Sequence, residues 1–116
     1  MREGDVLTVK RDVITDGRIS IRTAKRDLWI DIPVSRESRE ALAGQAAHDA
    51  ITLCATSRGT PWTADGFRAS FFKLIRALEE AGNVHPGLTF HGLRHTAASV
   101  FAENGVSAED ISGVLG

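Results

Sequence analysis

The first third of the chain alternates hydrophobic and polar residues, a period of two that is typical of half-buried β-strands. Apolar residues stand at every second position in 19–22 and again in 28–34. These segments predict two strands, joined by a hairpin turn over residues 23–27. The apolar run at 5–9 is too short to distinguish the two periods, and we interpret it as a helix.

Beyond the hairpin, the apolar positions follow helical spacing, and capping residues and glycines stand where helices would begin and end. Four helices are predicted, each opened by a hydroxyl residue suited to capping the first turn. The second and third are expected to end near Gly82 and Gly105, and the fourth is still running at the end of the sequence. The last three caps are flanked by apolar pairs at the spacing of a hydrophobic staple. The caps are Ser35, Thr63, Thr89 and Ser107.

The apolar stripes of two of these helices are expected to face the core. The members of the first stripe are Phe67, Phe71, Leu74, Ile75 and Leu78, and those of the second are Leu93, Ala97, Val100 and Phe101. Trp29 and Trp62 are interpreted as core or staple residues, with base-stacking platforms as the alternative. Cys54, the only cysteine, lies in an apolar run and is expected to be a buried, reduced thiol.

One hairpin followed by several capped helices predicts an α+β, mainly helical fold with a small antiparallel sheet packed on helices. The 116 residues fit one unit, 1–116, with no internal repeat or linker. Apolar residues make up 42% and charged residues 25%, which excludes a disordered or low-complexity chain. No signal peptide or membrane-spanning run is visible, so we expect a cytoplasmic location and no membrane partner.

Charge is distributed unevenly along the chain although its net charge is only -1. Residues 1–26 hold seven Lys or Arg against four acidic residues, whereas residues 95–116 hold three acidic residues and no Lys or Arg. The N-terminal part could therefore present a surface to phosphates, although an ordinary solvated face would carry the same charges.

The segment from His91 to Thr96 combines residues suited to oxyanion chemistry. At helical spacing, His91, Arg94 and His95 share one side of the predicted helix. An imidazole near a helix N-terminus is favoured in its neutral, proton-exchanging form. A guanidinium one turn later offers paired donors to two phosphate oxygens. The alternative is an ordinary surface pair.

The run His91-Gly92-Leu93-Arg94-His95-Thr96-Ala97-Ala98-Ser99, with Gly105, Ile111 and Leu115-Gly116 after it, resembles the second conserved box of tyrosine recombinases, the phage integrase family. The N-terminal segment from Met1 to Leu7 resembles the first box, in which an Arg is followed three residues later by Glu or Asp. Lys25, in the predicted turn, falls where the family places its catalytic lysine. The resemblance covers the whole chain.

The resemblance implies a catalytic set of Arg2, Lys25, His91 and Arg94. Arg2 and Arg94 would hold the scissile phosphate, His91 would assist proton transfer, and Lys25 would protonate the departing 5′-hydroxyl. Family members break and rejoin DNA through a 3′-phosphotyrosyl intermediate, which needs neither metal nor another cofactor. Duplex DNA and other recombinase protomers are the implied partners, and the DNA-associated location would be in a bacterial or phage-derived system. Three arginines near the hairpin could contact backbone phosphates: Arg18, Arg22 and Arg26.

The sequence departs from the family pattern in having no tyrosine at all. The nucleophile is therefore missing, and the chain is expected to be part of a recombinase catalytic domain that lacks the core-binding domain and the tyrosine segment. Such a chain should bind DNA weakly and not cleave it by itself. Two alternatives stay open: a truncated remnant that binds DNA or pairs with an intact recombinase, and a zinc-dependent hydrolase built on His91 and His95.

Overall fold

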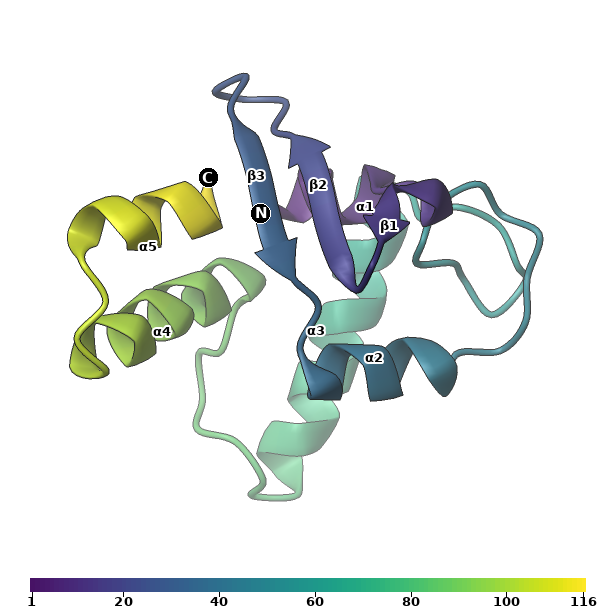
Figure 1. The fold of residues 1–116 in the computed structure, drawn as a ribbon. Coiled ribbons are helices and arrows are strands. Elements are labelled where there is room, and N and C mark those ends of the chain that lie inside the picture. Colours follow the sequence, from purple (N-terminus) through teal and green to yellow (C-terminus); the bar gives the residue numbers. More distant parts are fainter.

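The computed structural model describes all 116 residues and is 48% helical. Its helices surround a small sheet, with α4 and α5 beside one edge strand and α3 behind (Figure 1). The predicted α+β class is confirmed. In chain order the elements are α1 (Glu3–Thr8), the 3-10 turn η1 (Arg11–Val13), β1 (Ile14–Thr15), β2 (Arg18–Arg22), β3 (Trp29–Pro33), α2 (Arg36–Ala43), α3 (Ala64–Glu80), α4 (Phe90–Glu103) and α5 (Ala108–Leu115).

The sheet is antiparallel with the order β1-β2-β3. The predicted hairpin is confirmed, and its register pairs Ile19 with Ile32 and Ile21 with Ile30. Both Ile19 and Ile30 are buried, so this face of the hairpin forms part of the core. The two-residue strand β1 was not predicted, because a segment that short has no measurable period.

All four predicted helix caps form, and the helix predicted over residues 5–9 is present as α1. In each capped helix the hydroxyl of the capping residue accepts a hydrogen bond from the backbone N–H three positions later. The staple between Trp62 and Phe67 is present as an edge-to-face pair with ring centroids 5.9 Å apart. One helix end differs from the prediction: α5 stops at Leu115, and Gly116 takes a positive φ of 82°.

The core is small and centred on the inner face of the sheet. Only 11 of the 116 residues are buried, and the accessible surface is 8162 Å². A compact monomer of this mass exposes about 6,200 Å². The radius of gyration is 15.1 Å, compared with about 13.4 Å for a compact chain of this length. The seven buried apolar residues are Leu7, Val9, Ile19, Ile30, Val34, Ala50 and Ile75.

The two helical stripes expected in the core are only partly covered. In α3, Ile75 is buried but Leu74 is 56% exposed. No residue of α4 is buried, and Leu93 and Val100 are 43% and 48% exposed. The reason is architectural: α4 packs mainly on α5, so no element covers the face that carries these two residues.

Two single-residue predictions are also corrected. Trp29 is 71% exposed rather than in the core, because it lies on the outer face of β3 with Asp31 and Pro33. Cys54 is half-buried rather than buried, and this partial burial raises the pKa of its thiol. None of the helices combines the length and apolar character that spanning a bilayer requires.

Candidate functional site

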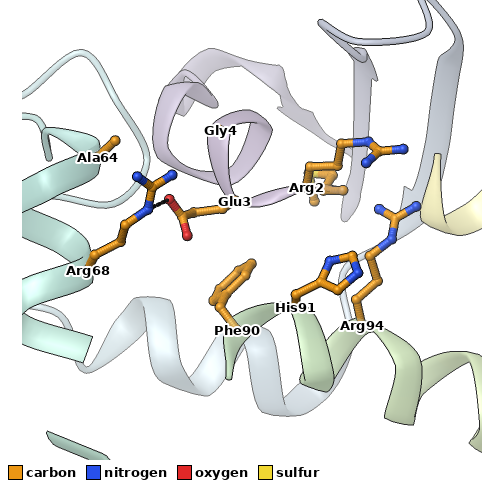
Figure 2. Close-up of a pocket in the computed structure, with 9 residues that line it drawn as sticks. Arg2, Glu3, Gly4, Ala64, Arg68, Phe90, His91 and Arg94 are labelled. Atoms are coloured by element: carbon orange, nitrogen blue, oxygen red, sulfur yellow. Dashed lines mark hydrogen bonds and ion pairs between the residues drawn. The ribbon is translucent and has the colours of Figure 1, made fainter. Parts of the chain in front are cut away.

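A pocket of about 280 Å³ lies where the N-terminal segment meets α3 and α4. Three of the four residues predicted as catalytic line it: Arg2, His91 and Arg94. They stand at one end of the pocket, whereas Arg68 and Glu3 occupy the other (Figure 2). Arg2 therefore shares one concave surface with His91 and Arg94, which lie 89 and 92 positions later in the sequence.

The first turn of α4 presents His91 to this pocket. Thr89 caps the helix by accepting a hydrogen bond from the Gly92 N–H at 2.9 Å, which places His91 second in the helix. The imidazole is exposed, and its Nε2 lies 3.1 Å from Nε2 of His95 one turn later. The two rings are edge-to-face, with centroids 4.7 Å apart. One ring must donate and the other accept in this contact, so at least one of these nitrogens carries a proton.

Arg94 is fixed by the end of α5. Its Nη1 donates to the Leu115 carbonyl at 2.5 Å and its Nη2 donates to the Gly116 carbonyl at 2.7 Å. Partial burial lowers the pKa of Arg94, and the positive charges of Arg2 and Arg26 lower it further. A guanidinium has five N–H donors, so three remain after these two bonds. Arg94 stays protonated at neutral pH and keeps donors for an anion in the pocket.

The backbone of Arg2 is held by a buried carboxylate. Asp5 Oδ2 accepts a hydrogen bond from the Arg2 N–H, and Asp5 Oδ1 accepts one from the Ala24 N–H, both at 3.0 Å. Burial alone would raise the pKa of Asp5, but these bonds, assisted by nearby positive charges, lower it. Asp5 thus links the start of α1 to the β2–β3 turn.

Lys25 follows Ala24 in that turn and does not line the pocket. Its side chain is exposed, so the structure brings together only three of the four predicted catalytic residues. Of the three arginines predicted to contact DNA, Arg18 pairs with Asp31 and Arg22 pairs with Asp27 on the exposed surface of the hairpin. Arg26 is exposed and forms no ion pair.

Two polar residues that line the pocket, Arg68 and Glu3, were not among the predicted site residues. Arg68 of α3 donates from Nε to Glu3 Oε1 at 2.9 Å, across 65 positions of sequence. No local signal links these residues. The aromatic contacts between α3 and α4 bring Arg68 into place: the ring of Phe90 lies 5.6 Å from that of Phe67 and 6.0 Å from that of Phe71, between centroids.

The charges that line the pocket favour an anion over a cation. It holds three guanidinium groups and one carboxylate, and that carboxylate is paired with Arg68. No group of three or more His, Cys, Asp or Glu side chains is placed to hold a metal ion. The zinc alternative therefore has two of the three protein ligands that a catalytic zinc site uses.

Comparisons with known proteins bear on the fold and on the family of the chain. The crystal structure of XerA recombinase superposes with a TM-score of 0.77 at 23% sequence identity, covering 99% of this chain and 43% of that one. The chain thus spans less than half the length of this structural relative. No curated protein sequence matches the chain. The sequence model of the phage integrase family matches residues 1–116, and the chain belongs to that family.

Proposed function

We propose that the pocket formed by Arg2, His91 and Arg94 binds a phosphate of duplex DNA. The observation that carries the proposal is the convergence of two arginines and a histidine from distant parts of the sequence on one pocket whose only carboxylate is already paired. A phosphodiester carries one negative charge over two free oxygens, and guanidinium groups match this arrangement with paired donors.

The same residues suit phosphoryl transfer. Fixed positive donors around a transferring phosphoryl group stabilise the charge that develops in the transition state. Arg94 is held in place by α5 before any ligand arrives, so little reorganisation accompanies binding. His91 offers an exposed imidazole for proton transfer at the edge of the site.

In the intact protein, the reaction we propose is site-specific recombination. A tyrosine hydroxyl attacks the phosphorus and gives its proton to His91, the bond from phosphorus to the 5′-oxygen breaks, and Lys25 supplies the proton that the 5′-oxygen takes up. Lys25 reaches the site only if the exposed turn moves toward bound DNA. Arg18, Arg22 and Arg26 then contact neighbouring phosphates. Other protomers are partners in this reaction, which takes place on DNA in the cytoplasm.

Residues 1–116 supply part of this catalytic domain and contain no tyrosine. We therefore propose that this chain binds DNA weakly, with little sequence preference, and forms no covalent adduct with it. Its affinity should not exceed that of non-specific binding, with a Kd of about 10⁻⁴ to 10⁻⁶ M, and should fall steeply with salt.

The binding half of the proposal is tested by fluorescence anisotropy with a labelled duplex over a range of salt concentrations. Arg2→Ala and Arg94→Ala should each weaken binding and reduce the slope of log K against log salt by about one. Arg58→Ala is the matched control, because Arg58 is exposed, forms no ion pair and lies outside the pocket. Equal losses in all three variants would show that the pocket is not the phosphate site.

The chemical half is tested on a denaturing gel after incubation with nicked duplex DNA. The 116-residue chain should give no protein-linked DNA band. If the open reading frame continues past the codon for Gly116 to a tyrosine, the extended protein should give one. A stop codon directly after Gly116 would favour the non-catalytic remnant, and a covalent band from the chain without tyrosine would refute the proposal.

A further inference from the structure

The end of α5 supplies the acceptors that hold Arg94. The carbonyls of Leu115 and Gly116 accept one hydrogen bond each from its two terminal nitrogens. The last carbonyls of a helix have no partner within the helix, and the helix dipole makes this end negative. The planar guanidinium of Arg94 therefore caps α5 while remaining part of the pocket wall. Its orientation depends on where the end of α5 lies.

That end is packed against the hairpin without room for a side chain at Gly116. The residue is buried, and its φ of 82° is in the left-handed region. A Cβ at this position would lie 2.7 Å from Cδ1 of Ile30 and 3.1 Å from Cγ2 of Thr23. Ile30 is only 1% exposed, so packed neighbours surround its side chain and restrict how far Cδ1 can move.

We propose that Gly116 is a positioning residue for Arg94, and that the contact between Gly116 and Ile30 sets the orientation of the phosphate-binding guanidinium. This inference rests on the proposed phosphate site. A side chain at position 116 displaces the end of α5 from β3, and the Leu115 and Gly116 carbonyls then move away from Arg94. The guanidinium loses its two anchors and no longer points its free donors into the pocket in one fixed direction.

The contact with Thr23 extends the effect to the hairpin. Thr23 is 3% exposed and stands at the start of the turn that carries Ala24 and Lys25. Gly116 therefore contacts the same turn that Asp5 holds through the Ala24 N–H. A displaced α5 frees this side of the turn as well as Arg94.

The experiment compares Gly116→Ala with Gly113→Ala in the same helix. Gly113 has no positive φ, and a Cβ there would have no neighbour within 4 Å, so this variant controls for adding a methyl group to α5. The first readout is the Nε–Hε signal of Arg94 in ¹H–¹⁵N NMR spectra of the full chain without DNA. The second is the salt-dependent affinity for a duplex, with far-UV circular dichroism as the test of folding.

Gly116→Ala should shift or broaden the Arg94 signal, weaken DNA binding by about tenfold and lower the salt slope by about one, as loss of a phosphate contact does. Gly113→Ala should leave all three at their wild-type values. Ile30→Val in the Gly116→Ala background removes the Cδ1 atom that the new methyl group would meet, and should return the Arg94 signal toward its wild-type position.

A wild-type Arg94 signal in folded Gly116→Ala would overturn the inference. An Arg94 signal that stays displaced in the folded double variant Gly116→Ala/Ile30→Val would also overturn it. The double variant provides this test even if Gly116→Ala alone does not fold. Failure of the proposed function looks different, because wild type and Arg94→Ala would then bind DNA equally well. The NMR comparison without DNA would still report on Gly116.

Discussion

Asp5 should contribute more to stability than any other acidic residue in the N-terminal half. The substitution to test is Asp5→Ala, which removes the acceptor of the Arg2 and Ala24 N–H groups. Asp5 is 7% exposed, so water cannot fully replace the lost oxygens. A part-buried N–H left without an acceptor costs about 1–3 kcal/mol. Two such groups predict a loss of about 2–6 kcal/mol in the free energy of unfolding.

The assay is urea denaturation at pH 7, followed by circular dichroism, with the m value checked for a change in unfolding cooperativity. Asp49→Ala is the control, because Asp49 is exposed and forms no ion pair or side-chain hydrogen bond, and its effect should stay within about 0.5 kcal/mol. The loss is large for a chain with 11 buried residues, given that domains are usually stable by about 5–15 kcal/mol. Equal stability of the two variants would refute the claim that Asp5 ties α1 to the hairpin.

Three further predictions concern stability and reactivity. The hydrogen bonds to Asp5 lower its pKa in the folded state, so unfolding takes up a proton in acid. The free energy of unfolding should therefore fall as the pH drops below about 4. In Asp5→Asn, the free energy of unfolding should depend less steeply on pH over this range. Trp29→Ala should change the free energy of unfolding by less than about 0.5 kcal/mol, because Trp29 is 71% exposed, and a larger loss in urea melts would contradict the orientation of β3. Because burial raises the pKa of its thiol, Cys54 in the folded chain should react with a thiol reagent at pH 8 more slowly than free cysteine. In urea it should react at the rate of free cysteine. Equal rates in the folded chain and in urea would show that the thiol is not covered.

The elements that could be predicted are those specified by neighbouring residues. A capping hydroxyl and the N–H three positions later are close in sequence, and Ser35, Thr63, Thr89 and Ser107 all cap as expected. The alternation over 28–34 likewise determines the faces of β3. It places Trp29 on the outer face of the sheet and Ile30 on the inner face, so the exposure of Trp29 follows from the pattern. The prediction that Trp29 is a core or staple residue was therefore wrong.

Features that depend on packing between distant elements could not be predicted from local patterns. Leu93 and Val100 form an apolar stripe, but whether a stripe is buried depends on a second element covering it. The pair between Glu3 and Arg68 depends on the docking of α3 against α4. The hydrogen bonds from Arg94 to Leu115 and Gly116 could not be predicted for the same reason, because the sequence alone does not show how α5 packs against α4.

Binding of a DNA phosphate in this pocket can be followed residue by residue in an NMR titration of the chain with a short duplex. We expect the largest shifts on the side chains of Arg2, His91 and Arg94 and on the backbone of the β2–β3 turn, and we expect them to shrink as salt is added. Shifts confined to surfaces away from the pocket, or none at these three residues at saturating DNA, would contradict phosphate binding in this pocket.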